Sequence, residues 1–505
     1  MPTMSEPART GEGRPILSLF SGLEKSPAGP FTGLSGVLAP MLLAWLAHQP
    51  RVTLVITSTV ERARRLADET RTWLGTRSRR VAVFLPDRAS VYDQTAVDAE
   101  TARDRLAAFA MEAAGGGVVI APVPAAAERF MGPRAWRDAT IRLAPGEMAR
   151  PGELATTLTR LGYERSNLVT DPGQFAVRGG LVDVYSPHSE LPVRLDFFGD
   201  ELESVKSFSP ETQRTLEKLD RAILTPALEH PIDNESRQSA VAAIVTAEAG
   251  MDATRAELLQ RRLERLSGRP DSRDIRELMP FFAPGHSYLW DAWPTARILL
   301  EDPDQIAEEL DAFISDQQVR YAASIDLTPL LPPEAYYHDA KPILASLKSR
   351  EASFFSRFRH PEPAGLAFDV EPLPPAADPT RESLLKEIQR LVRENWAIAL
   401  VITDSERYHN LRGLLGERKV PLINPRFPWQ LAYGRVVLLE GAGRRGFMAR
   451  GERIIVMGED DIYPTQAKPS VKRHATADKA QAFISQLVTG DLVVHSEHGI
   501  AEYRG

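Results

Sequence analysis

The strongest constraint on the fold is a run of six residues, Val52–Thr57, in which every residue is apolar or β-branched. Such a run is typical of a strand that is buried on both faces, as in a parallel sheet covered by helices. Ser58 or Thr59 can cap the helix that follows, which the sequence carries to about Leu74. A buried strand that runs into a capped helix predicts an α/β architecture.

The same alternation recurs along the chain. After the first strand and helix, we expect strands at 81–85 and 118–121 and a helix at 101–111. Towards the other end, Leu400–Arg407 repeats the order of residue types in Leu54–Arg62. This similarity has two interpretations, an internal repeat or convergence on a common unit, and convergence is favoured because the strand–cap–helix unit occurs so widely.

Changes in composition and pattern divide the 505 residues into units, and a chain of this length predicts three or four domains. The expected units are a disordered tail (1–13), the first half of an α/β lobe (14–140), an inserted β-rich domain (141–226), the helical second half of the lobe (227–358, with helices at 251–266 and 306–313), a Pro-rich extended linker (359–380), a small α/β domain (381–465), a second linker (466–488) and the start of a small β domain (489–505). A lone hairpin is not stable in water, so we expect the last domain to be incomplete and the chain to be a fragment.

Charge and composition exclude several classes of protein. The formal net charge is −7, so the chain as a whole is not an electrostatic clamp for DNA, although a local basic patch is compatible with that total. The chain has no cysteine, which excludes disulfides and thiolate metal sites and is consistent with the cytoplasm. The longest apolar run, 37–47, is too short to span a bilayer and reads as a buried helix, so we expect no membrane partner.

The segment Phe31–Pro40 is the first candidate for a nucleotide site, because it precedes an apolar helix. It contains Gly33 and Gly36, but Leu38, Ala39 and Pro40 occupy the positions where a P-loop carries Gly-Lys-Ser/Thr. A P-loop needs the lysine for the β- and γ-phosphates and the hydroxyl for Mg²⁺. We therefore expect a degenerate P-loop and no cofactor in this chain.

A second glycine-rich segment, Gly441–Gly446, has the formal spacing of a dinucleotide-binding fingerprint. That fingerprint requires a helix next, whose amino end holds the pyrophosphate. Here Phe447–Gly451 leads into another apolar strand at Ile454–Met457. We interpret the glycines as a structural loop between strands.

Neither the histidines nor the acidic residues form a convincing site. His495, Glu497 and His498 lie on a strand-to-turn segment, where alternate side chains point to opposite faces, so we expect no metal site. Four carboxylates surround one hairpin turn: Asp196, Asp200, Glu201 and Glu203. At a turn such a group is more typical of a solvated rim than of paired catalytic acids.

The strand Val193–Phe198 carries the most informative pattern. Its alternate positions from Val193 onwards are apolar and predict a buried face, whereas Arg194, Asp196 and Phe198 share the opposite face. The same alternation turns Arg178 outwards on the preceding strand. Arginine and aromatic residues on one open face are typical of an interface hot spot. The alternative is that a neighbouring element covers this phenylalanine.

Three consecutive segments, 175–187, 192–204 and 209–215, resemble a motif shared by UvrB and the bacterial transcription-repair coupling factors. The degenerate loop at 31–40 resembles the coupling factors rather than UvrB, which keeps an intact P-loop. Gly490–Tyr503 is similar to the opening of the coupling factor's RNA-polymerase-interacting domain. The chain therefore resembles the N-terminal part of that family.

The resemblance implies a UvrB-like module of α/β lobes with an inserted β-rich domain that recruits UvrA. Arg178, Arg194 and Phe198 match the family's UvrA-contacting positions. It also implies RNA polymerase as a partner through the last segment, and DNA, ATP and Mg²⁺ for motor domains whose motifs are absent here. We therefore expect an adaptor without enzymatic activity of its own; the alternatives are a piece of an ATP-dependent translocase and a DNA-binding UvrB-like repair module.

Overall fold

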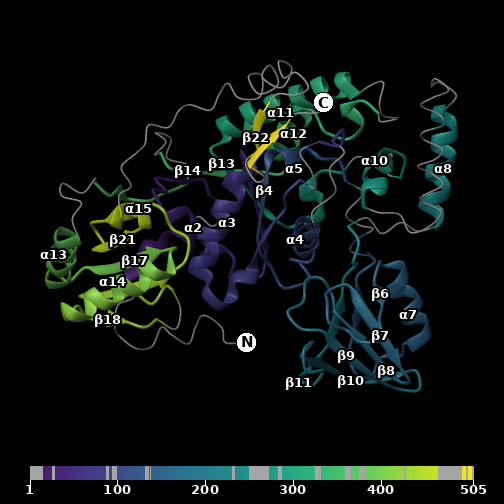
Figure 1. Ribbon diagram of the computed structural model, residues 1–505, viewed down its shortest axis with the longest axis horizontal. Coiled ribbons are helices and arrows are strands. Elements are labelled where there is room, and N and C mark those ends of the chain that lie inside the picture. Colours follow the sequence, from purple (N-terminus) through teal and green to yellow (C-terminus); the bar gives the residue numbers. More distant parts are fainter. Residues whose placement is uncertain are drawn as a thin grey trace. The chain divides into compact units, whose positions relative to one another are not determined.

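The computed structural model (Figure 1) describes most of the chain. The described residues are 15–24, 29–86, 90–93, 99–130, 136, 138–229, 234–248, 257, 272–282, 287–324, 331–358, 365–374, 381–425, 428–463, 492–495 and 499–502. The expected tail at 1–13, the expected helix at 251–266 (apart from residue 257) and the linker at 466–488 lie outside them. The chain divides into two units, Met1–Ile462 and Tyr463–Gly505, each described by itself.

A seven-stranded sheet forms the centre of the first lobe, in the order β15-β1-β14-β13-β2-β4-β3. Its strands are β1 Phe31–Thr32, β2 Val52–Thr57, β3 Val81–Val83, β4 Gly117–Pro122, β13 Arg297–Glu301, β14 Ser353–Ser356 and β15 Leu366–Ala367. All neighbouring strands are parallel. Strand β2 lies between β13 and β4, so the segments on either side of the inserted domain fold as one sheet.

The predicted strand–cap–helix unit is confirmed. Strand β2 is buried throughout and runs into α3 (Val60–Leu74), whose amino end is capped where the Thr59 hydroxyl accepts the backbone N–H of Arg62 at 3.2 Å. Helices α2 (Leu38–Leu46) and α3 cover one face of the sheet. The opposite face is covered by α4 Ala99–Phe109, α5 Val123–Ala127, α11 Pro303–Ser324 and α12 Ala340–Ser349. The α/β class expected from the sequence is therefore what the chain forms.

The second α/β domain is a six-stranded mixed sheet in the order β16-β20-β21-β17-β19-β18. Its elements are α13 Arg381–Arg393, β16 Glu371–Pro372, β17 Ala397–Ile402, α14 Ser405–Glu417, β18 Leu422–Ile423, β19 Arg435–Glu440, β20 Phe447–Ala449, β21 Ile454–Met457 and α15 Glu459–Ile462. The Asp404 carboxylate caps α14 by accepting the N–H of Arg407 at 2.8 Å, as Thr59 caps α3. The buried residues of this second domain pack against the core formed by α2 and α3, so the two α/β domains share one apolar core.

The segment expected to be a Pro-rich linker contributes to both sheets. Within its described residues, 365–374, β15 pairs with β1 at the edge of the first sheet. A few residues further on, β16 pairs antiparallel with β20 at the edge of the second sheet. The linker is thus an edge strand of each α/β sheet in turn.

The inserted domain is a six-stranded sheet in the order β11-β10-β9-β8-β7-β6, with α7 (Pro151–Arg160) against it (Figure 1). Its strands are β6 Glu164–Arg165, β7 Gln174–Arg178, β8 Leu181–Val184, β9 Val193–Phe198, β10 Glu201–Phe208 and β11 Thr215–Leu219, and a separate pair joins β5 Ile141–Leu143 to β12 Ala222–Leu224. Leucines of α7 and one face of the sheet form the main core. A small second core of Val169, Ala176, Tyr185 and Phe208 lies on the other face.

The remaining described elements are peripheral to the sheets. They are α1 Pro15–Leu19, α8 Asn234–Glu248 and α10 Ser272–Phe282, the last two of which contact each other. In the second unit, β22 Leu492–His495 and β23 Gly499–Glu502 form the antiparallel hairpin expected there. Glu497 and His498 lie outside the described residues. No helix in the part of the chain that the structure describes is long and apolar enough to span a membrane.

Candidate functional site

The outer face of the inserted sheet brings the three predicted contact residues onto one side. In the strand pairings, Arg178 lies opposite Leu181, and Leu181 lies opposite Asp196. Residues in one such row point to the same face, and Asp196 shares its face with Arg194 and Phe198 by the period of two. The alternation predicted for β9 is confirmed, because Leu195 and Phe197 are buried on the opposite side.

Phe198 lies open at the corner of this face. Its side chain is 77% exposed, which favours the contact interpretation over a covering neighbour. Glu201 pairs with Phe198 on one side, and Met148 pairs with the same Glu201 on the other. Met148 is 71% exposed, so two open apolar side chains flank one carboxylate in a single row. Met148 is not apparent from the sequence, because it lies outside any periodic run and reaches the row only through an isolated bridge.

The two arginines have different surroundings. Arg178 is exposed, and its guanidinium donates to the backbone carbonyl of Asn167. Arg194 is largely covered, with 19% of its side chain exposed, and donates two hydrogen bonds to the buried Asp183 carboxylate at 2.7 and 2.8 Å. Its guanidinium also stacks 4.7 Å from the centre of the Phe208 ring. The hydrogen bonds from Arg194 to Asp183 raise the pKa of that guanidinium.

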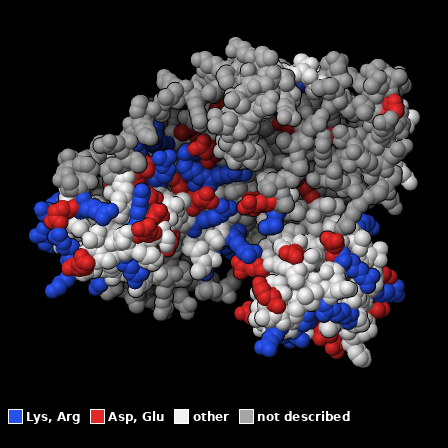
Figure 2. All heavy atoms as spheres, in the orientation of Figure 1, with Lys and Arg blue, Asp and Glu red and all other residues white. Residues whose placement is uncertain are grey.

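The charge of Arg194 is therefore already balanced within the domain, which the sequence pattern does not reveal. The arginine fixes the register of β8 and β9 behind the exposed corner as much as it presents a cation to solvent. On the side of the inserted domain that Figure 2 shows, Lys and Arg are interspersed with Asp and Glu. Phe198 and Met148 are the most exposed of the large apolar side chains described in this domain.

The loop at 31–40 has the context of a P-loop, but several of its backbone N–H groups already donate hydrogen bonds. Gly33 and Gly36 have φ of 76° and 57°, which favour glycine, and the loop joins β1 to α2. The N–H of Leu34 donates to the carbonyl of Ser356 at 3.1 Å. The N–H of Val37, at the amino end of α2, donates to the carbonyl of Arg445 at 2.9 Å. Amides that would face a phosphate in a working P-loop are already bonded to carbonyls.

Ala39 and Pro40 are buried within α2, at the positions where a P-loop carries its lysine and its Ser or Thr. The glycine-rich segment 441–446 of the second α/β domain lies against this loop. No helix follows it, since β20 begins at Phe447. A Cβ at Gly36 would overlap the carbonyl oxygen of Gly446, so glycine permits the two backbones to touch. We call 441–446 the plug loop.

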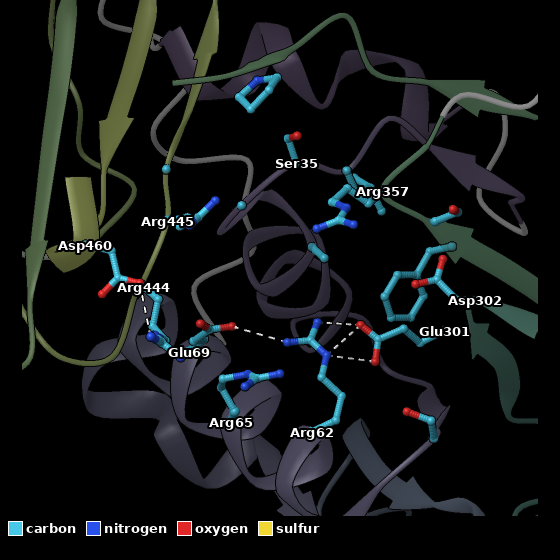
Figure 3. Close-up of a pocket in the computed structure, with 18 of the residues that line it drawn as sticks. Ser35, Arg62, Arg65, Glu69, Glu301, Asp302, Arg357, Arg444, Arg445 and Asp460 are labelled. Atoms are coloured by element: carbon cyan, nitrogen blue, oxygen red, sulfur yellow. Dashed lines mark hydrogen bonds and ion pairs between the residues drawn. The ribbon is translucent and has the colours of Figure 1, made fainter. Parts of the chain in front are cut away.

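A cleft of about 630 Å³ opens beside the plug loop (Figure 3). Arginines and carboxylates line its walls, and Arg62 forms a two-pronged ion pair with Glu301 at its base. Among the described residues, no group of three or more His, Asp or Glu side chains has the arrangement of a metal site. The cleft therefore presents several arginine side chains together with the hydroxyls of Ser35, Ser58 and Thr59.

The inserted domain, whose sheet carries the open corner, matches the family described as the UvrB interaction domain over residues 141–230. The chain as a whole is similar to transcription-repair-coupling factors. It is 25% identical to that of Bacillus subtilis over 97% of this chain and 43% of the relative, and 28% identical to that of Myxococcus xanthus over 99% and 44%.

A further relative, the transcription-repair-coupling factor of Staphylococcus haemolyticus, is 24% identical over 73% of this chain and 33% of its own length. The resemblance predicted from the residues of β7 to β11 is therefore confirmed, and the chain is similar to these factors along nearly its whole length. It spans less than half the length of the relatives that it matches.

Proposed function

We propose that this chain is an adaptor of transcription-coupled DNA repair, which recruits UvrA through the open corner of its UvrB interaction domain. Two findings support the proposal at the level of the family: the domain that matches residues 141–230, and the name shared by the relatives. The contact residues are Phe198 and Arg178, with Arg194 behind them. Met148 joins them because it lies in the same row as Phe198.

The observation that carries the proposal is that Phe198 and Met148 are both exposed and lie in one row, on either side of Glu201. Burying an aromatic ring and a thioether of this size is strongly favourable, so a partner with an apolar pocket gains most from this corner. Arg178, exposed on the same face, adds a cation that can meet a carboxylate on that partner.

Titration calorimetry of UvrA with the full chain tests the proposal. Phe198→Ala should weaken binding by at least about 2 kcal/mol, the loss typical of a hot spot, which is roughly thirtyfold. Phe358→Ala is the matched control, because Phe358 is 65% exposed and lies outside the inserted domain. Equal affinities for the wild type and Phe198→Ala contradict the site, and a wild-type chain that does not bind UvrA contradicts the adaptor function.

RNA polymerase is the second partner that we propose, engaged through the segment that opens at Gly490. We propose DNA binding and ATP-driven translocation for the longer relatives and not for this chain. We propose the cytoplasm as the compartment of this chain and of those relatives. The DNA-binding alternative for this chain predicts a gel shift that weakens steeply with salt.

A further inference from the structure

The cleft beside the plug loop lies where ligands bind in open α/β sheets. It is built on the loops that follow the carboxyl ends of β1, β2, β13 and β14, represented by Ser35, Ser58, Asp302 and Arg357. Parallel sheets place binding sites at this edge. A volume of about 630 Å³ lies within the range of roughly 300–1,000 Å³ that small-molecule sites occupy.

Most of the carboxylates around the cleft already have partners. Glu301 holds Arg62 through both of its oxygens, and Asp460 pairs with Arg444 at 3.2 Å. Asp461 accepts the backbone N–H groups of the plug loop's last glycine at 2.6 Å and of Gly458 at 2.9 Å. The side chains of Glu301, Asp460 and Asp461 are therefore already engaged in ion pairs or hydrogen bonds with other residues of the cleft or its surroundings.

Glu69 is likewise engaged. It is buried, and its carboxylate lies 3.9 Å from Arg62. Burial is the largest cause of its raised pKa, and the charges of Arg62 and Arg65 act against that rise. Asp302 is the remaining acid at the cleft for which the described part of the chain shows no hydrogen bond or close ion pair from the side chain.

Three arginines at the cleft have no close ion pair among the described residues, so their guanidinium groups can bind an anion. Arg357 and Arg445 have no ion pair within 4 Å among the described residues, and they extend towards each other from opposite walls (Figure 3). Arg65 has a loose pair, at 3.7 Å, with Glu61, whose side chain is 88% exposed, and its charge also acts on Glu69. Such an exposed pair contributes little. Three cations and one carboxylate at the cleft are thus without a close ion pair among the described residues, although Arg65 and Arg445 also interact at longer range with Glu69 and Asp461.

We propose that this cleft binds a phosphorylated small molecule of about mononucleotide size, held by Arg65, Arg357 and Arg445. Guanidinium groups match phosphate oxygens in a two-pronged geometry and remain charged at every physiological pH. Because the amides of Leu34 and Val37 are bonded to carbonyls, the ligand is held by side chains and not by a P-loop cradle. Arg357 belongs to the first lobe and Arg445 to the second α/β domain, so the bound anion joins the two.

Calorimetric titration of the full chain with inorganic pyrophosphate, at constant ionic strength, tests this assignment. Arg357→Gln and Arg445→Gln change exposed side chains and should each weaken binding about tenfold, the loss expected for one charge-assisted contact. Arg64→Gln and Arg435→Gln are matched controls, because both side chains are exposed and neither lines the cleft. The controls should bind pyrophosphate like the wild type.

Pyrophosphate that gives neither heat nor a shift in melting temperature overturns the assignment, as does an equal loss of affinity in the control variants. A short DNA duplex supplies phosphate from the other source. If the duplex binds, loses affinity in Arg357→Gln and displaces pyrophosphate, the ligand is a nucleic-acid backbone and the small-molecule assignment is wrong. UvrA affinity is measured separately, and a change there bears on the inserted domain alone.

Discussion

Reversal of the charge at Arg194 tests how the predicted contact face is held together. Asp183 is 3% exposed and its two oxygens accept hydrogen bonds from Arg194. In Arg194→Glu two carboxylates face each other and the buried acid loses its partner, which typically costs roughly 3–5 kcal/mol. Because a domain's total stability is about 5–15 kcal/mol, we expect local opening of β8 and β9 as well as weaker UvrA binding.

The double variant Asp183→Arg/Arg194→Asp separates the two effects, because it keeps an ion pair in the same place with its polarity reversed. Hydrogen–deuterium exchange of β8 and β9 in the full chain reports the pair, since no tryptophan lies within 141–230 to serve as a fluorescent probe. Protection lost in Arg194→Glu should return, at least in part, in the double variant. Calorimetry with UvrA then shows whether binding returns with it.

The outcomes of this experiment differ clearly. If protection and UvrA binding both return, Arg194 positions the face on which Phe198 lies. If protection returns without binding, Arg194 is itself a contact. If Arg194→Glu exchanges like the wild type, the ion pair contributes little to the domain and the reasoning from its burial is refuted.

Two further predictions concern buried charged or titratable groups. Arg105 is fully buried between Glu128 and Glu229, and its guanidinium lies 4.1 Å from the centre of the Phe84 ring. Arg105→Met should therefore destabilise the first lobe by roughly 3–5 kcal/mol. An unchanged urea midpoint, measured by tryptophan fluorescence, contradicts this prediction. Burial lowers the pKa of His188 to about 4, so on acidification the unfolded chain protonates this histidine before the folded chain does. The free energy of unfolding should therefore fall as the pH drops from about 6.5 to 4, by at most roughly 3 kcal/mol. His188→Gln should remove that dependence from hydrogen exchange of the inserted domain, and an identical pH profile in this variant contradicts the assignment.

Local patterns in the sequence predict the parts of the fold that depend on neighbouring residues. The run at β2 needs burial on both faces, and the hydroxyl of Thr59 caps the helix that follows it. The period of two in β9 similarly predicts that Phe198 faces away from the core. These features are decided within a few residues, so one sequence is sufficient to find them.

Features set by long-range pairing are not visible in the same way. The partner of Arg194 depends on the register between β8 and β9, and Met148 reaches Glu201 through a single bridge. The glycines at 441–446 indicate a structural loop between strands, but only the tertiary structure shows that this loop packs against the loop at 31–40. The same limit applies to the cleft, whose three available arginines come from distant parts of the chain.

The residues that link the two α/β domains also protect each sheet from unwanted association. An open edge strand is a template on which another chain can add and begin to aggregate. Here the first sheet ends in Leu366–Ala367 and the second ends in Glu371–Pro372, two residues each. Strands so short offer little for a foreign strand to pair with, and Pro372 has no N–H to donate. A single extended segment therefore ends one edge of each sheet in a strand with few groups for a foreign strand to pair with, while it carries the chain from one sheet to the other.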